Sequence, residues 1–367
     1  MSDSSITRRE VLKRTAGTLA VAAAAGGLAW WLRDDEGPQV GVPPKHGGVT
    51  LPNYFAKIDW PGGYPRLSIV VGSIEQIDEM VNRAITALTK GEGLKRLIQP
   101  GDVVLIKPNV GFDRPPQMGA TTHPQIVAAV AKLCFEARAS QVLVADNPIE
   151  SPAACFAKSR IQTAAEAAGA KVVWPAGSDF ERLTLRDRPP DPARGEALGS
   201  WPVYTGPLVQ ATKLIGIAPV KDHNLSSASM NLKNWYGLLG GRRNQFHQAI
   251  HEIVSDLALA FSPTLVIADA TRVMMRNGPT GGRLSDVQPG GVLGRPAIVA
   301  AVDPVACDAW CYQQLLGRDP AQLAYLELAQ SKIAERIAAG KKRFGSRDWS
   351  ALKQQGLIAR VSLDERV

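Results

Sequence analysis

The densest group of residues able to do chemistry lies between positions 221 and 247. It combines two lysines, two histidines and an amide, namely Lys221, His223, Lys233, Asn234 and His247. Ammonium groups attract carboxylates and phosphates, and amides donate hydrogen bonds to the same anions. A desolvated lysine or an imidazole can also move a proton near neutral pH. We therefore predict Lys221, His223 and Lys233 to be catalytic and Asn234 and His247 to bind the ligand; the alternative is a basic surface loop.

Two earlier segments offer further groups for an anion. Lys107 and Asn109 follow an apolar run, and Thr122 and His123 come directly before Pro124. The start of a helix attracts anions through its free N–H groups. All four side chains are therefore predicted to bind the ligand. The alternatives are a solvated turn for Lys107 and Asn109, helix capping for Thr122, and an exposed imidazole for His123.

Two acidic residues are candidate metal ligands. Asp269 and Asp303 each follow an apolar run, and paired carboxylates suit a hard divalent cation such as magnesium or calcium. The alternative for Asp303, which precedes Pro304, is to cap a helix, and the residue types favour it. Asp308 is expected to pair with a lysine of the basic group. The sequence indicates no other cofactor.

Several other chemistries lack their motifs. Ser255 stands where an H-E-x-x-H motif beginning at His251 needs its second histidine, and no nucleophile elbow, Walker loop or dinucleotide fingerprint occurs. The four cysteines are not spaced as in an iron–sulfur motif and are predicted to be buried. A formal charge of +8 favours small anionic partners. Without a zinc finger or an arginine-rich arm, no nucleic-acid partner is expected.

The candidate residues lie far apart in the chain, so a scaffold must bring them together. From Leu67 onward, short apolar runs alternate with amphipathic segments. This alternation predicts an α/β fold with a mostly parallel sheet covered by helices on both faces. In such sheets, ligands bind beyond the carboxyl ends of the strands. Lys107, Lys221 and Asp269 all follow or end predicted strands.

The predicted elements can be stated as ranges. Strands are expected at 67–71, 103–106, 142–145, 171–174, 213–218, 265–268 and 297–301, with a short one at 358–361. Helices are expected at 73–88, 125–137, 161–168, 249–261 and 305–316. A proline-rich stretch at 186–207 interrupts the alternation.

The N-terminal segment is predicted to be an export signal. Residues 5–13 read S-I-T-R-R-E-V-L-K, which resembles the twin-arginine signature, and an uncharged, alanine-rich stretch follows. The predicted organisation is a signal or membrane anchor at 1–32, a linker rich in proline and glycine at 33–65, an α/β domain at 66–340 and a C-terminal tail at 341–367. The expected partner is the twin-arginine export machinery. The expected location is the periplasm or, with an uncut signal, the outer face of the cytoplasmic membrane.

Short motifs at the predicted strand ends resemble those of the domain-of-unknown-function 362 family. They are V-L-I-K-P-N at 104–109, T-T-H-P at 121–124, V-L-V-A-D at 142–146, A-P-V-K-D-H at 218–223, N-L-K-N-W-Y-G at 231–237, G-P at 278–279 and D-P-V-A-C-D at 303–308. The resemblance covers roughly residues 67–330. It implies the architecture but no settled reaction. Some relatives carry a ferredoxin-like cysteine module that this sequence lacks.

Together these features predict an exported α/β protein that binds, or acts on, a small anionic ligand. Lysine, histidine and asparagine side chains at the carboxyl ends of the strands would form the site. The alternative, which the family resemblance raises, is a redox-associated or assembly protein. It would lack a cluster of its own and work with an electron-transfer partner that holds one.

Overall fold

The computed structural model describes residues 49–363, except for positions 187, 341 and 343. The predicted signal at 1–32 and the start of the predicted linker lie outside these residues. Within the described part of the chain, no helix combines the length and the apolar character needed to cross a bilayer.

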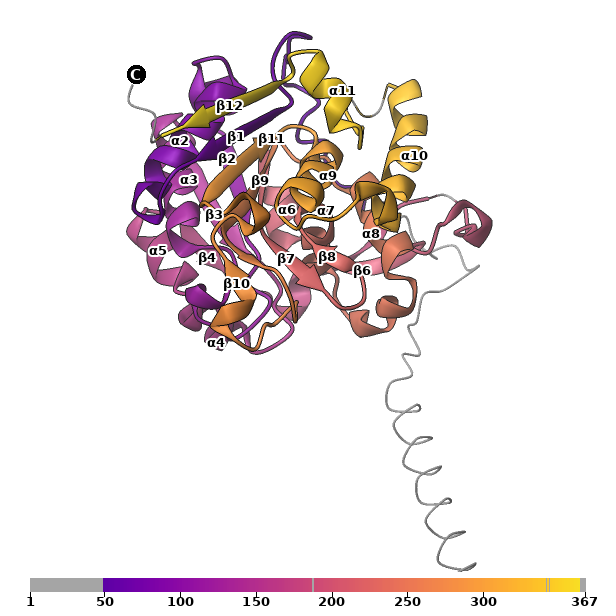
Figure 1. Ribbon diagram of the computed structural model, residues 1–367. Helices are drawn as coiled ribbons and strands as arrows, with labels where there is room; N and C mark the ends of the chain where they lie inside the picture. The colour runs from indigo at the N-terminus through magenta and orange to yellow at the C-terminus, as the bar shows by residue number, and fades with distance from the viewer. Residues whose placement is uncertain (1–48, 187, 341, 343, 364–367) are drawn as a thin grey trace, which may run out of the picture.

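A ten-stranded sheet forms the centre of the molecule (Figure 1). Its strands are β1 (Leu67–Val71), β2 (Val103–Lys107), β3 (Gln141–Ala145), β4 (Lys171–Val173), β7 (Lys213–His223), β8 (Ser227–Ser229), β9 (Leu265–Met274), β10 (Val287–Gln288), β11 (Ala297–Ala301) and β12 (Ile358–Ser362). The main path is β12-β1-β11-β9-β7-β2-β3-β4, with β8 paired to β7 and β10 to β9. Along the main path, every neighbouring pair is parallel except the two that β11 makes. The predicted α/β fold is confirmed.

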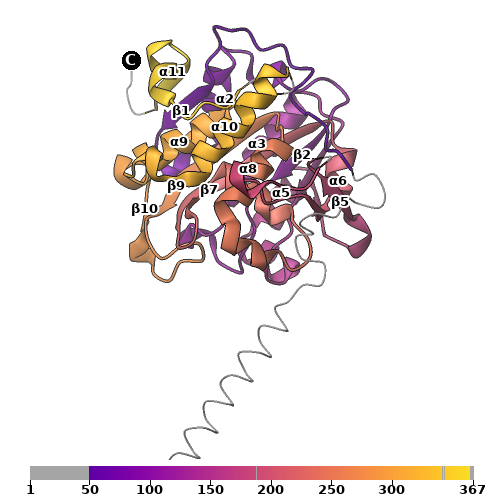
Figure 2. The ribbon, with the colours of Figure 1, turned by 90° about the vertical axis from the view of Figure 1, so that its right-hand side faces the viewer.

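Helices cover both faces of this sheet. One face carries α2 (Ile77–Leu88), α3 (Pro124–Glu136), α4 (Pro152–Lys158) and α5 (Ile161–Ala167). The other carries α7 (Asn231–Asn234), α8 (Ile250–Ala260), α9 (Pro304–Gln314) and α10 (Ala324–Ala338), and Figure 2 shows α8, α9 and α10 in front of the sheet. The short helices α6 (Gly206–Gln210) and α11 (Trp349–Gln354) pack on this second side, as does a separate hairpin of β5 (Phe180–Thr184) and β6 (Ser200–Tyr204).

The apolar runs form strands because both faces of the sheet are buried. In β9, Val266 and Ala268 join the core under α8 and α9, whereas Leu265 and Ile267 join the core under α2 and α3. Successive side chains of a strand point to opposite faces. A strand covered on both sides therefore needs apolar residues at every position, which is the pattern that the sequence shows.

The order of the strands reverses between β2 and β7. From β2 the chain continues outward to β3 and β4, whereas from β7 it continues in the other direction to β9. In an open α/β sheet, the loops that leave two such strands diverge and open a crevice at their carboxyl ends. Lys107 ends β2, and Lys221 and His223 lie in the last part of β7. The fold therefore directs three of the predicted residues to this crevice.

The folded domain extends beyond the predicted 66–340 at both ends. Leu51, Tyr54 and Trp60, from the predicted linker, are buried, and the Tyr54 hydroxyl donates a hydrogen bond to the Leu208 carbonyl at 2.8 Å. The predicted tail contributes α11 and β12, and β12 pairs in parallel with β1. Proline and glycine in the linker suggested a tether, but the aromatic residues between them pack into the core.

All four cysteines agree with their predicted role. Cys134, Cys155, Cys307 and Cys311 are buried and unpaired. Burial raises the pKa of the Cys134 thiol far above its usual range, so this thiol is neutral and unreactive.

The packing of residues 51–60 can be tested with one substitution. Trp60 is 1% exposed and contacts the rings of Phe55 and Tyr64. Trp60→Ala should lower the free energy of unfolding by about 3–5 kcal/mol, measured by urea denaturation, because it leaves a large cavity. Lys57→Ala, at an exposed neighbouring position, should change it by less than about 0.5 kcal/mol. Equal unfolding midpoints for the two variants would show that this segment is a tether.

Candidate functional site

The base of the site is a buried ion pair between the ends of β2 and β3. Lys107 Nζ lies 2.8 Å from Asp146 Oδ1, and both side chains are almost completely buried. Lys107 Nζ also donates to the Pro108 carbonyl at 2.9 Å and to Asn234 Oδ1 at 2.7 Å. The second carboxylate oxygen of Asp146 accepts the Val110 N–H at 2.7 Å. Burial lowers the pKa of Lys107, and the Asp146 carboxylate opposes this shift.

Asn234 joins this pair to the neighbouring strand. Its Nδ2 donates to the carbonyls of Lys107 and Ile217 at 3.2 and 3.3 Å, and its Oδ1 also accepts from Asn109 Nδ2 at 3.3 Å. The Asn234 amide therefore uses its donors and acceptor within the protein. It fixes α7 against β2 and β7 rather than facing a ligand.

The backbone of Gly237 lies directly against the ion pair. A β-carbon at this position would lie 2.8 Å from Asp146 Oδ1 and 2.9 Å from Lys107 Nζ. Real β-carbons do not approach polar atoms so closely, and a side chain here would displace one partner of a buried charge pair. A residue larger than glycine would therefore force one of the two charged side chains to move.

Lys221 lies above the pair without a carboxylate partner. Its Nζ donates to the Ala120 carbonyl at 2.6 Å and to Asn109 Oδ1 at 3.3 Å, and it lies 4.9 Å from the centre of the Phe112 ring. The residue is 1% exposed. Burial, followed by the charges of Lys233 and Lys107, holds the pKa of Lys221 well below its ordinary value, since both effects disfavour a second positive charge.

Lys233 extends from α7 toward the same space. Its Nζ lies 4.9 Å from the centre of the Tyr236 ring, and in the described part of the chain no hydrogen-bond acceptor contacts it. Burial, with the charges of Arg243 and Lys107, lowers the pKa of Lys233 to about 7. The helix itself is held by Asp308 on α9, which accepts the N–H groups of Asn231 and Leu232 at 3.0 and 2.9 Å. Asp308 thus caps α7, and the predicted pairing with a lysine is wrong.

His223 has a defined tautomer. Its Nδ1 accepts the N–H groups of Leu225 and Ser226 at 3.1 and 3.3 Å. A neutral imidazole that accepts at Nδ1 carries its proton on Nε2. Burial and the charges of Lys233 and Lys221 lower the pKa of His223 to about 2. His223 is therefore a neutral hydrogen-bond donor and has no free lone pair.

His247 has the opposite arrangement. Its Nδ1 lies 2.8 Å from the Asn244 carbonyl, which can only accept, so Nδ1 carries the proton and Nε2 has the lone pair. Burial and the nearby charges of Lys233 and Arg243 lower the pKa of His247, and the Asn244 carbonyl opposes them. The two imidazole rings are nearly parallel, with centroids 6.2 Å apart. One neutral donor and one neutral acceptor therefore stand side by side.

These groups surround a cavity of about 180 Å³. Its lining includes five of the nine predicted catalytic and ligand-binding residues, namely Asn109, Lys221, His223, Lys233 and His247. Arg243 also lines it, and a groove of about 670 Å³ that shares Asn147, Ile149 and Arg243 lies next to it. The predicted residues from β2, β7, α7 and the segment before α8 therefore converge, although they are far apart in the sequence.

Arg243 is a residue that the sequence reasoning missed. Its guanidinium donates to the carbonyls of Gly237 and Leu239 at 2.6 and 2.9 Å, and to that of Asn147 at 2.7 Å. It thus fixes the loop that follows α7 and adds a positive charge to the cavity. Burial lowers its pKa. The doublet Arg242-Arg243 carried no signal for burial, because basic doublets in loops are ordinarily solvated.

The other predicted ligand-binding residues do not line the cavity. They contact the backbone and the side chains that surround it. Lys107 and Asn234 lie beneath the cavity and contact each other. Thr122 accepts the Asn109 N–H at 2.8 Å through its hydroxyl, which donates to the Ile217 carbonyl at 2.8 Å. His123 is the N-cap of α3. The N-cap is therefore His123 and not Thr122, as the capping alternative had it, and Thr122 instead orients the loop that carries Asn109.

Asp269 and Asp303 do not form the predicted pair. Because β11 runs antiparallel to β9, with Ala301 opposite Val266, Asp303 lies at the edge of the sheet where the parallel strands begin. There it caps α9 through the Ala306 N–H at 3.1 Å. Asp269 accepts the His123 N–H at 2.8 Å and the Thr271 hydroxyl at 2.6 Å. Among the described residues, no group of three or more histidine, cysteine or acidic side chains is arranged to hold a metal ion.

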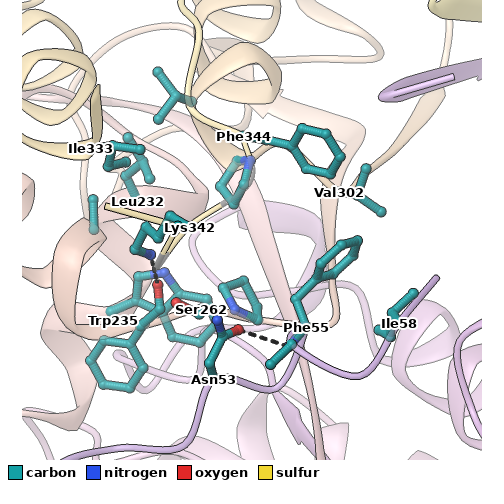
Figure 3. Close-up of a pocket in the computed structure, with 17 residues that line it drawn as sticks. Asn53, Phe55, Ile58, Leu232, Trp235, Ser262, Val302, Ile333, Lys342 and Phe344 are labelled. Atoms are coloured by element: carbon teal, nitrogen blue, oxygen red, sulfur yellow. Dashed lines mark hydrogen bonds between the residues drawn. The ribbon is translucent and has the colours of Figure 1, made fainter. Parts of the chain in front are cut away.

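A second cavity lies at that opposite edge of the sheet (Figure 3). It measures about 280 Å³, and its lining is mainly apolar, with Phe55, Trp235 and Phe344 among the labelled residues. Lys342 also lines it, and its Nζ donates to the Phe261 carbonyl at 2.7 Å. None of the predicted site residues lines this cavity, so we place the candidate site at the β2–β7 crevice.

This chain is similar to several known proteins. The chain is 25% identical to a thylakoid-associated protein of Synechocystis sp. over 269 residues, which cover 69% of this chain and 74% of the relative. Among solved structures, the lactate racemase apoprotein of Thermoanaerobacterium thermosaccharolyticum aligns with a TM-score of 0.32 and 15% identity, over 62% of this chain and 56% of that one. A protein from Thermotoga maritima aligns with a TM-score of 0.30 and 10% identity, over 69% of this chain and 59% of that one.

The family assignment rests on the match to a family model. The family model described as a domain of unknown function, DUF362, matches residues 104–313. This range contains every residue named above as lining the β2–β7 cavity and ends within α9. The chain is a member of the DUF362 family.

Proposed function

We propose that the β2–β7 cavity binds a small ligand with a carboxylate or phosphate group. One observation carries this proposal: Lys221, Lys233 and Arg243 are buried around one cavity, and in the described part of the chain none has a carboxylate within ion-pair distance. Burying a charge without a counter-charge is unfavourable. A bound anion would supply the missing counter-charge.

Lys107 supports this interpretation by contrast. It is as deeply buried as Lys221, but its charge is balanced by Asp146 at 2.8 Å. A buried lysine of purely structural function is expected to have such a partner. Lys221 has two neutral oxygen acceptors instead. The site thus carries a positive charge that its own residues do not balance.

The two histidines favour proton transfer on the bound ligand. His247 Nε2 has the lone pair that accepts a proton, and His223 Nε2–H is the group that donates a hydrogen bond to developing negative charge. We therefore assign the role of proton acceptor to His247 rather than to His223. Export by the twin-arginine route stays a prediction, because residues 1–48 lie outside the described chain.

Anion binding should stabilise the folded protein. Phosphate, pyruvate and propionate can be tested as probes by thermal unfolding and calorimetry, because a ligand present at 100 times its Kd adds about 2.7 kcal/mol to the free energy of unfolding. Lys221→Met should abolish the stabilisation by whichever probe binds. Without ligand, this variant should be at least as stable as the wild type, since it removes a buried charge that lacks a counter-charge.

Lys132→Met is the matched control. It also removes one positive charge, but its side chain is 55% exposed and its partner Asp78 is 3.5 Å away on the surface. Such pairs contribute little, so binding should be unchanged. If Lys221→Met keeps the full response to every probe that stabilises the wild type, or if no anion binds the wild type, the proposal fails.

Stability should depend on pH through Lys233. Its pKa is about 7 in the folded protein against an ordinary value of 10.5, so between these values the unfolded chain binds more protons. The free energy of unfolding should therefore rise with pH in this window, by at most about 1.4 kcal/mol per pH unit from this group. Urea denaturation from pH 7 to 9 should show a flatter rise for Lys233→Met. Parallel profiles for the variant and the wild type would contradict the assignment.

The histidine tautomers can be read directly by NMR. Long-range ¹H–¹⁵N spectra should show His223 protonated at Nε2, without titration between pH 5 and pH 8, because its pKa is about 2. His247 should be protonated at Nδ1. The chain has five histidines, so His223→Gln and His247→Gln assign the signals. A His223 signal that titrates above pH 5 would remove it as a neutral donor.

A further inference from the structure

We propose that the ligand of this site is a 2-oxo carboxylate and that the Lys233 amine condenses with its carbonyl carbon to form an imine. This inference rests on the proposed function, since the same cavity has to hold the carboxylate. It adds a reactive carbonyl to the ligand and a covalent step to the site.

The three buried lysines of the site differ in what their amines contact. Lys107 Nζ has three acceptors, from Asp146, Asn234 and Pro108. Lys221 Nζ has two, the Ala120 carbonyl and Asn109 Oδ1. In the described part of the chain, Lys233 Nζ contacts only the face of the Tyr236 ring. Lys233 can therefore lose a proton without breaking a hydrogen bond, and its lone pair would be free to attack.

The surroundings of Lys233 favour the neutral amine. The side chain is buried, and Arg243 and Lys107 contribute positive charge nearby. Burial beside other cations is the setting that activates a lysine as a nucleophile. Its pKa of about 7 leaves a substantial fraction of the amine unprotonated at neutral pH.

The remaining cations would hold the carboxylate. Lys221 and Arg243 both line the cavity, and their N–H groups are directed by neutral oxygen acceptors rather than by acids. A cavity of about 180 Å³ is smaller than the sites that hold drug-sized ligands, which begin at about 300 Å³. A short 2-oxo acid fits this combination of size and charge.

The step balances without an oxidant or a reductant. The Lys233 lone pair forms the C–N bond while the π electrons of the carbonyl move to its oxygen, which gives a carbinolamine once a proton has moved from nitrogen to oxygen. The second N–H proton is then transferred to the hydroxyl oxygen, the C–O bond breaks, water leaves, and C=N forms. His247 Nε2 would accept the proton from nitrogen, and His223 Nε2–H would stabilise the departing oxygen. His247 and Lys233 both line the cavity, and both contact the Tyr236 ring, at 5.4 Å and 4.9 Å from its centroid.

Reductive trapping tests this inference on the full chain. The protein is incubated with pyruvate and sodium cyanoborohydride, which reduces an iminium to a stable amine, and the adduct is located by peptide mass spectrometry. One adduct is expected, on Lys233. Propionate has the same carboxylate without the carbonyl, so it should bind, form no adduct and slow the trapping of pyruvate.

Two variants distinguish the loss of the adduct from a general loss of the fold. Lys233→Arg preserves the positive charge but cannot form an imine, so it should lose the adduct and still respond to propionate in thermal unfolding. Lys132→Met should give the wild-type adduct. If propionate and pyruvate stabilise the protein but no adduct forms on Lys233, the inference fails and the proposed function stands. If adducts spread over exposed lysines, the inference also fails; if neither acid binds, this inference has no site.

Discussion

The site depends on the buried ion pair between Lys107 and Asp146. A charge pair without access to water is tolerated only when further hydrogen bonds satisfy both partners. Here the pair has such bonds from Asn234, Pro108 and Val110. These contacts tie β2 to β3 and to α7, and Gly237 lies directly against them. Loss of either partner would leave an unpaired charge in the interior and free the helix that carries Lys233.

The Lys107–Asp146 pair leaves the other positive charges of the site without a nearby acidic partner in the described part of the chain. Once Asp146 has neutralised Lys107, no acid remains close enough to pair with Lys221, Lys233 or Arg243 in the described part of the chain. Burial then acts in the same direction on each of them, by disfavouring the protonated form. A site built in this way either holds an anion or leaves its two lysine amines neutral. The two states are linked, because a bound carboxylate restores the stability of the ammonium form.

The sequence predicted the scaffold better than the division of roles within the site. Doubly covered strands need apolar residues at every position, so the runs that became β2, β7 and β9 were visible directly. The direction of β11 could not be predicted, because an apolar run looks the same whichever way the strand runs in the sheet. The predicted pairing of Asp269 with Asp303 was therefore wrong. The sequence also could not show that Asn234 contacts Lys107, 127 positions earlier. Polar residues at a strand end look the same whether they bind a ligand or each other.

Arg243 and Asp308 illustrate a second limit. Each acts by hydrogen bonding to the backbone of a distant loop or helix. Backbone groups are identical at almost every residue, so their partners leave no pattern in the residue types around them. Only the folded arrangement shows that both residues position the segment 231–239.

The four buried thiols have a consequence for where this protein can keep its fold. Because none of them is oxidised to a cystine, no covalent cross-link contributes to stability, and a reductant has no bond to cleave. The described fold therefore needs no disulfide bond in order to form. It can form completely in a reducing compartment, where cysteine thiols stay reduced.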